Sequence, residues 1–230
     1  MILYDLVGKN NAHFSPNSWR VRMALAHKGL AYEVEPTLFT RIKDIAPGQK
    51  LTIPTIRDAD QLITDSWAIV EHLDRRYPST PRLISPGSDG LVTRFFQYWS
   101  QTAIHGGISD LILLDVHDQL ETADQAYFRA SREQRAGRSL EQMQSGREAR
   151  LDAFRKSLQP LRLAVGAHPY VGGNQPCYAD YLAFGGLQWA RVTSPLQLLA
   201  SDDPVHAWFE RCLDLHGGIG RLEPAFAGSR

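Results

Sequence analysis

The spacing of apolar residues changes character near residue 80, and this change constrains the fold more than any other feature of the chain. Residues 1–80 alternate short runs that favour strands with longer runs that favour helices. Residues 78–90, which are dense in Pro, Ser and Gly, are the best candidate for a linker. Beyond them only helical spacing remains. The sequence therefore predicts an α/β domain over residues 1–80 and an all-helical domain over residues 88–230.

The start of the first domain has the pattern of a βαβ unit. Strands are expected at residues 2–6 and 31–38, with a helix over residues 17–28 between them. Ser15 is a suitable N-cap for this helix, and Pro16 suits its first position. Two strands joined by such a crossover should be parallel.

The rest of the first domain has the pattern of a hairpin followed by a helix. Residues 52–65 should form two short antiparallel strands that turn at residues 58–61. Residues 66–77 have helical spacing, and Asp65 and Ser66 are a capping pair at its start.

The second domain is expected to contain helices alone. A charged segment, residues 131–151, should be a solvated helical stretch with a break near Gly137. The other helical segments are residues 91–120, 147–165, 179–192 and 204–216.

Charge and composition exclude several classes of function. The chain has 25 basic and 25 acidic residues, so no overall field favours nucleic acid or an anionic membrane. It has no apolar run that could cross a bilayer, and its first residues lack the basic region of a signal peptide. Cys177 and Cys212 are too few for a disulfide framework. No metal site is expected, because no second ligand is spaced to join His117, which is expected to be a hydrogen-bonded structural residue. We therefore expect a cytoplasmic protein.

Three local features allow both a structural and a functional interpretation. Ser15 can simply cap its helix, or its hydroxyl can stabilise a thiolate at the positive helix end and lower the pKa of that thiol. Asp65 and Ser66 can cap the next helix, or bind the carboxylate and ammonium groups of a ligand. Pro54 can begin a strand after a trans bond, or follow a cis bond that frees the backbone of Ile53 to pair with an extended peptide.

A nucleophilic serine is the competing interpretation of Ser15. The chain has eight histidines, but no GxSxG elbow surrounds Ser15 and no pattern orients a base toward it. We therefore do not expect a Ser-His-Asp triad.

In combination these features resemble the cytosolic glutathione transferases over nearly the whole chain. "SPNSWRVRMALAHKGL" (15–30) is similar to the motif of the serine-type members, "TDSWAIVEHLDRRYP" (64–78) to the γ-glutamyl-binding segment, and "YVGGNQPCYADYLAF" (170–184) to the capping-box helix. The resemblance implies a thioredoxin-like N-terminal domain of the β-α-β-β-β-α type, followed by an all-helical substrate-binding domain. It also implies glutathione as co-substrate, no metal, and a homodimer.

The same resemblance implies catalytic roles for the opening segment. Ser15 would donate a hydrogen bond to the glutathione sulfur. Asn17 would assist at the sulfur, or would be a residue of the helix surface. The glycyl carboxylate of glutathione would meet Gln49 or Lys50.

The remaining contacts to glutathione are implied by the middle of the first domain. Ile53, ahead of a cis Pro54, would pair through its backbone with the cysteinyl residue. Asp65 and Ser66 would hold the γ-glutamyl end.

Two departures from the family pattern matter. The capping box normally starts with Ser or Thr, whereas here Cys177 stands at that position and Asp180 at the position that reaches back. Ser15 and Ser18 leave no dithiol, so redox chemistry of the thioredoxin kind is not expected.

Within the family the chain is similar to the bacterial lignin β-aryl-etherases and the fungal etherase-type transferases. The similar segments are "FSPNSW" (14–19), "LLDVHDQL" (113–120), residues 127–151 and "DLHGGIGR" (214–221). This implies an enzyme that adds the glutathione thiolate to an electrophilic carbon of an aromatic substrate, either cleaving β-aryl ethers or conjugating electrophiles in detoxification. A non-catalytic carrier of glutathione or hydrophobic ligands is the other alternative.

The acceptor site should lie between the two domains, as ligand pockets often do. The candidates to line it are large aromatic residues and one histidine beside two glycines, each of which could instead be helical core: Phe14, Phe95, Trp99, His105 and Trp189.

Overall fold

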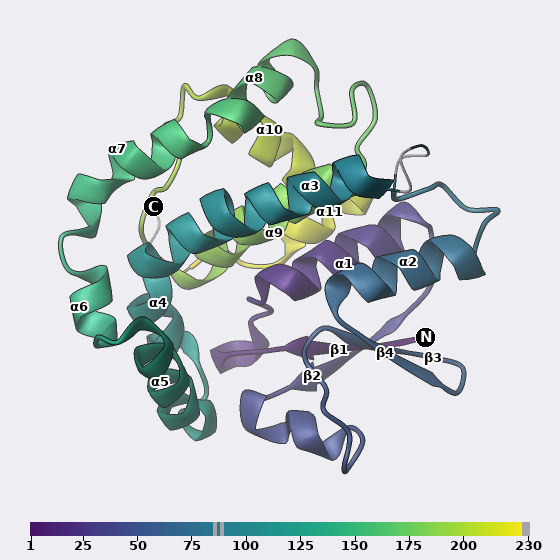
Figure 1. The fold of residues 1–230 in the computed structure, drawn as a ribbon, viewed down its shortest axis with the longest axis horizontal. Helices are drawn as coiled ribbons and strands as arrows, with labels where there is room; N and C mark the ends of the chain where they lie inside the picture. Colours follow the sequence, from purple (N-terminus) through teal and green to yellow (C-terminus); the bar gives the residue numbers. More distant parts are fainter. Residues whose placement is uncertain (85–86, 88–89, 227–230) are drawn as a thin grey trace.

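The computed structural model describes residues 1–84, 87 and 90–226. The N-terminal part contains β1 (Ile2–Leu6), α1 (Pro16–His27), β2 (Glu33–Thr37), the 3₁₀ helix η2 (Phe39–Asp44), β3 (Thr55–Asp58), β4 (Gln61–Thr64) and α2 (Ser66–Arg76), with a short turn η1 (Lys9–Asn11) after β1. The sheet order is β2-β1-β3-β4 (Figure 1). β1 pairs with β2 in parallel, and β3 pairs antiparallel with both β1 and β4. The predicted βαβ unit and hairpin are confirmed.

The hairpin is shorter than the sequence pattern suggested. Its strands begin at Thr55 rather than at residue 52, because residues 52–54 form a loop that Thr55 closes by donating its hydroxyl to the Thr52 carbonyl at 2.6 Å. Asp58 pairs with Gln61, so the turn falls at the predicted place.

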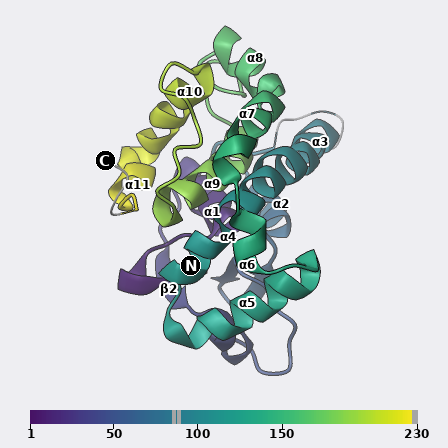
Figure 2. The ribbon, with the colours of Figure 1, turned by 90° about the vertical axis from the view of Figure 1, so that its left-hand side faces the viewer.

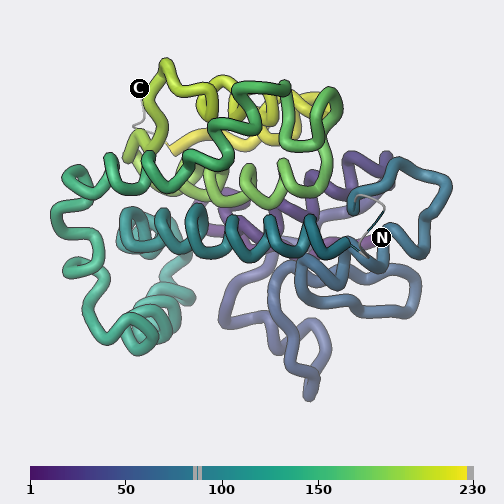
Figure 3. Tube along the Cα trace, turned by 45° about the horizontal axis from the view of Figure 1, so that its top comes forward, coloured from purple at the N-terminus to yellow at the C-terminus, as the bar shows by residue number. Residues whose placement is uncertain are grey.

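The rest of the described chain is helical. Its elements are α3 (Leu91–Trp99), the π-helical segment η4 (Ser100–Gly106), α4 (Gly107–Gln119), α5 (Thr122–Ala136), α6 (Leu140–Gln144), α7 (Arg147–Ser157), α8 (Gln159–Ala167), α9 (Tyr178–Thr193), α10 (Pro204–Leu213) and α11 (Leu215–Leu222). α3, η4 and α4 follow one another as a long rod, visible in teal in Figure 3. The thioredoxin-like part followed by an all-helical part is the predicted architecture. No helix of the described ranges is long and apolar enough to cross a bilayer.

Two predicted helical segments are interrupted, and each interruption has a local cause. α5 ends at Ala136, and Gly137 follows at φ 67°, a left-handed conformation that glycine adopts without strain. The segment 147–165 divides at Leu158, after which α8 begins with Pro160 in its first turn. Residues 85–86 and 88–89 of the expected linker lie outside the described residues.

α1 packs directly on α9, and this contact joins the two parts of the chain (Figure 1). A Cβ atom at Gly185 would lie 2.3 Å from the Pro16 carbonyl oxygen, so only glycine allows this approach. One turn further along α1, the buried Trp19 meets Phe184 edge to face, with ring centroids 6.1 Å apart. The first turn of α1 is therefore held against the helical part of the chain.

Asp180 organises the start of α9 from inside the protein. Its fully buried carboxylate accepts hydrogen bonds from the backbone N–H groups of Val171, Gly172 and Cys177, and from Nε1 of Trp208. The bond from the Cys177 N–H, at 3.0 Å, is the reaching-back half of the predicted capping box. Four donors around one carboxylate offset the cost of burying its charge.

Candidate functional site

The first turn of α1 carries the candidate catalytic serine. Ser15 is the N-cap, and its Oγ accepts a hydrogen bond from the Ser18 backbone N–H at 3.2 Å. A hydroxyl that accepts one bond still has its own proton to donate. Ser15 is only 3% exposed, and it lines a cavity. The structure thus combines a donor hydroxyl with the positive end of a helix dipole.

The backbone ahead of Ser15 is fixed from three directions. Trp19 donates from Nε1 to the His13 carbonyl at 2.8 Å, and the His13 N–H donates to the Glu223 carboxylate at 2.9 Å. The His13 imidazole also contacts the Asp5 carboxylate, with Nδ1 and Oδ2 2.9 Å apart. Burial raises the pKa of the Glu223 carboxyl, and its contact with His13 opposes this rise. Residues distant in sequence therefore position Ser15.

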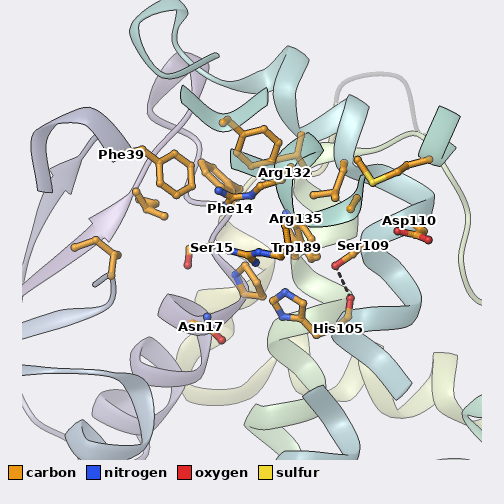
Figure 4. Close-up of a pocket in the computed structure, with 18 of the residues that line it drawn as sticks. Phe14, Ser15, Asn17, Phe39, His105, Ser109, Asp110, Arg132, Arg135 and Trp189 are labelled. Carbon is orange, nitrogen blue, oxygen red and sulfur yellow. Dashed lines mark hydrogen bonds between the residues drawn. The ribbon is translucent and has the colours of Figure 1, made fainter. Parts of the chain in front are cut away.

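The cavity has a volume of about 470 Å³ and lies between the two parts of the chain (Figure 4). One side is formed by the first turn of α1, by η2 and by Ile53. The other side is formed by η4, α4, α5 and α9. Its lining is rich in aromatic rings: Phe14, Phe39, Phe128 and Trp189.

Asp124 attaches η2 to the helical part and so sets the position of Phe39. Its fully buried carboxylate accepts from the Phe39 N–H at 2.6 Å, the Thr40 N–H at 2.9 Å and the Thr40 hydroxyl at 2.9 Å. Figure 2 shows α5, which carries Asp124, in the lower part of the molecule. An acid of one domain thus caps a helix of the other.

Three buried polar atoms of cavity residues have no hydrogen-bond partner among the described residues. They are Oδ1 of Asn17, Nδ1 of His105 and Nε1 of Trp189. The rings of His105 and Trp189 lie 5.0 Å apart, centroid to centroid. Buried polar groups are normally paired, so these atoms are available to a ligand or to water.

His105 is a neutral residue of the cavity wall. Burial lowers the pKa of its imidazole to about 4, and the positive charges of Arg20, Arg132 and Arg135 contribute to the decrease. The ring lies on the π-helical segment, not at a helix break, although two glycines follow it. The second of these, Gly107, allows close packing, because a Cβ there would lie 2.9 Å from Phe154.

The start of α2 has the predicted capping geometry but lies outside the lining of this cavity. Asp65 is exposed, at φ 77°, and accepts from the N–H groups of Trp67 and Ala68 at 3.0 and 3.1 Å. Ser66 is buried, and its carbonyl accepts a long bond of 3.4 Å from the Tyr178 hydroxyl.

The Ile53–Pro54 peptide bond is cis, which is the second of the two alternatives considered for Pro54 in the sequence. Ile53 is buried and lines the cavity. Gln49 and Lys50 are exposed on the loop before it and do not line the cavity.

The structure brings together only part of the expected acceptor site. Phe14, His105 and Trp189 line the cavity. Phe95 is 73% exposed on α3, and Trp99 packs on Phe96 with centroids 5.2 Å apart, so neither lies in the lining.

The lining residues that sequence reasoning missed include two aromatic and two cationic side chains: Phe39, Phe128, Arg132 and Arg135. Arg132 and Arg135 belong to the segment 131–151, expected to be solvated, but Arg132 is partly buried. Its burial depends on how α5 packs against η2, which helical spacing alone does not indicate.

The described part of the chain contains no group of three or more His, Cys, Asp or Glu side chains that could hold a metal ion. His117 contacts Asp118, with Nδ1 and Oδ1 2.8 Å apart. Cys177 and Cys212 are both free thiols.

Two family models match the chain, one to each part. Residues 11–81 match the glutathione S-transferase N-terminal domain, and residues 92–214 match the glutathione S-transferase C-terminal domain. A solved glutathione S-transferase of Ceriporiopsis subvermispora, in complex with glutathione, superposes with a TM-score of 0.77. It is 25% identical in sequence, and the match covers 94% of this chain and 95% of that one.

Curated relatives are similar over different lengths. Glutathione S-transferase Z1 of Arabidopsis thaliana is 42% identical over 71 residues, which are 28% of this chain and 31% of that protein. The chain thus matches about a third of that relative's length. The glutathione S-transferase-like protein ustS of Aspergillus flavus is 25% identical over 220 residues, covering 82% of this chain and 78% of that protein.

The environment of His105 generates a prediction about protonation. Its imidazole should stay neutral until the pH approaches its pKa of about 4. The unfolded value is about 6.5, so the unfolded state binds more protons between these two values. The contribution of His105 to the free energy of unfolding is therefore fully present above about pH 6.5 and is lost as the pH falls toward 4.

Nuclear magnetic resonance titration of the imidazole signals measures this pKa directly, with His105→Gln as the control that assigns the signal. The variant should also show a flatter dependence of stability on pH across the same interval. A His105 pKa close to the unfolded value would contradict the buried, cationic surroundings described above.

Proposed function

The chain belongs to the glutathione S-transferase family, and from this premise we propose that it binds glutathione and activates the thiol through Ser15. One observation carries the proposal: the Ser15 hydroxyl lies at the cavity wall and at a helix N-terminus, with a proton left to donate. A hydroxyl donor and the positive end of a helix dipole both stabilise an anion, so a thiolate placed there would be favoured over the thiol. The Asn17 side chain lies on the same turn, its Oδ1 has no hydrogen-bond partner among the residues described, and it is assigned to assist at the sulfur.

Glutathione is proposed to extend from this turn along the N-terminal part. Asp65 and Ser66 would hold the γ-glutamyl end, because an exposed carboxylate attracts an ammonium group and a helix N-terminus attracts a carboxylate. The backbone of Ile53 would pair with the cysteinyl residue. Gln49 or Lys50 would meet the glycyl carboxylate from the exposed loop.

The proposed reaction is attack of the bound thiolate on an electrophilic aromatic substrate. The aromatic lining of the cavity favours such a ring, and the enzyme would need only to align it with the sulfur. In ether cleavage a carbon–sulfur bond forms, the carbon–oxygen bond breaks, and a phenolate leaves. Conjugation of other electrophiles would use the same activation of the thiol. A carrier would bind glutathione or a hydrophobic ligand without activating the thiol.

Replacing Ser15 by Ala should lower kcat about 100-fold while the KM for glutathione changes less than about threefold, because one donor to the reacting atom is lost. Ser18→Ala is the matched control, since it removes a buried hydroxyl that has no hydrogen-bond partner in the described part of the chain and does not line the cavity. Steady-state rates with 1-chloro-2,4-dinitrobenzene and with a β-aryl ether measure both constants. Equal losses in kcat and in glutathione affinity would contradict the assigned role.

Two substitutions of Asp65 separate capping from ligand binding. Asp65→Asn keeps a good cap, so the free energy of unfolding should change by less than about 0.5 kcal/mol, while the Kd for glutathione rises about tenfold. Asp65→Ala should lose about 1 kcal/mol of stability in addition. Denaturant unfolding and titration calorimetry give the two quantities. If Asp65→Asn bound glutathione with unchanged affinity, Asp65 would only cap α2 and its assigned role in binding would be wrong.

We also propose a homodimer that buries one face of α3. Four large apolar or aromatic residues on this helix are between 59% and 73% exposed: Leu91, Val92, Phe95 and Tyr98. Patches of this kind mark interaction surfaces. Sedimentation velocity should give a dimer for the wild type and a monomer for Phe95→Glu. Leu163→Glu, at an exposed apolar position of α8, should remain dimeric, and a monomeric wild type would refute the proposal.

A further inference from the structure

The cavity contains two cationic side chains with no acidic partner in the part of the chain that the structure describes. Arg132 and Arg135 lie one turn apart on α5, and both line the cavity (Figure 4). Among the described residues, neither forms an ion pair. The acidic residue of the lining, Asp110, is already bound to Arg138, which lies outside the lining. The α5 side of the cavity therefore has an uncompensated positive charge.

Arg132 differs from another arginine of α5 in having no acidic partner within the described residues. Arg129, which lies on the same helix but outside the cavity lining, is paired with Glu133 and Glu141. The only hydrogen bond of the Arg132 guanidinium within the described chain goes to the Ser131 hydroxyl, at 3.3 Å. Burial lowers the pKa of Arg132, and the neighbouring Arg135 lowers it further.

The surroundings of Arg132 fit an aromatic ligand as well as an anionic one. Its guanidinium lies 4.2 Å from the Phe128 ring centroid and 5.2 Å from that of Phe39. These cation–π contacts stabilise the side chain in place but do not neutralise its charge. Guanidinium N–H groups bind carboxylates through bidentate, charge-assisted hydrogen bonds, which are stronger than hydrogen bonds between neutral groups.

We propose that the acceptor substrate is an aromatic compound with a carboxylate, which Arg132 and Arg135 bind while its ring contacts the aromatic lining. This inference deepens the proposed transferase function and rests on it. α5 and the first turn of α1 lie on different sides of the cavity, so a carboxylate held at α5 would direct the reacting carbon toward Ser15. His105 is neutral, so it would accept or donate a hydrogen bond to the substrate and would not be a further cation that attracts the carboxylate away from α5.

The test uses two electrophiles of the same shape, 4-chloro-3-nitrobenzoate and 4-chloro-3-nitrobenzamide. With either, the glutathione thiolate forms a carbon–sulfur bond, the carbon–chlorine bond breaks, and chloride leaves. Each kcat/KM is divided by the rate of the uncatalysed reaction, and the benzoate-to-benzamide ratio is compared between variants. Arg135→Gln removes one cation of the cavity, and Arg129→Gln removes the same charge from a position of the same helix outside the lining.

The wild-type ratio should exceed one and should fall about tenfold or more in Arg135→Gln, because a charge-assisted hydrogen bond is lost. Arg132→Met, which keeps the apolar stem, should cause a similar fall. Arg129→Gln should leave the ratio within about twofold of the wild type. A ratio that does not respond to Arg135→Gln and Arg132→Met, or that falls equally in Arg129→Gln, would overturn the anion site.

Failure of the transferase function gives a different result. It would abolish turnover of both electrophiles, the neutral benzamide included. In that case the affinities of the protein for the two aryl compounds, measured by titration calorimetry, test the anion site without requiring turnover. Tighter binding of the benzoate, lost in Arg135→Gln, would still support the site, and equal binding of the two compounds would overturn it.

Discussion

The close contact between the first turn of α1 and α9 is the constraint on which the site depends. Gly185 lets α9 reach the Pro16 carbonyl, and Trp19 packs on Phe184 beside it. Ser15 begins this turn, so the docking of two domains sets the position of one hydroxyl relative to the helical wall. Any side chain at Gly185 would clash with backbone, and would move the helix start away from α9.

The electrostatics of the cavity is local, because the chain as a whole has no net charge. The helix N-terminus at Ser15 and the α5 guanidinium groups, which form no ion pair within the described ranges, both favour negative charge, and they lie on different sides. Burial keeps His105, a residue of the same lining, neutral. Such a cavity suits two anionic groups, a thiolate at one wall and a carboxylate at the other.

The sequence predicted most of the fold, because the spacing of apolar residues and the caps are local signals. The βαβ unit, the hairpin and the break at Gly137 all follow from residues near one another in the chain. The acceptor wall was harder to predict, because it depends on which face of each helix meets the other domain. Phe95 faces solvent, whereas Arg132, in a segment with the composition of a solvated helix, faces the cavity.

Activation of a thiol by Ser15 is the central claim, and a pH titration of glutathione bound to the protein tests it most directly. The ultraviolet absorbance of the thiolate gives the pKa of the bound thiol. We expect a value well below that of free glutathione in the wild type and in Ser18→Ala, and a return toward the free value in Ser15→Ala. Glutathione that binds with an unchanged pKa would contradict the claim and would favour a carrier.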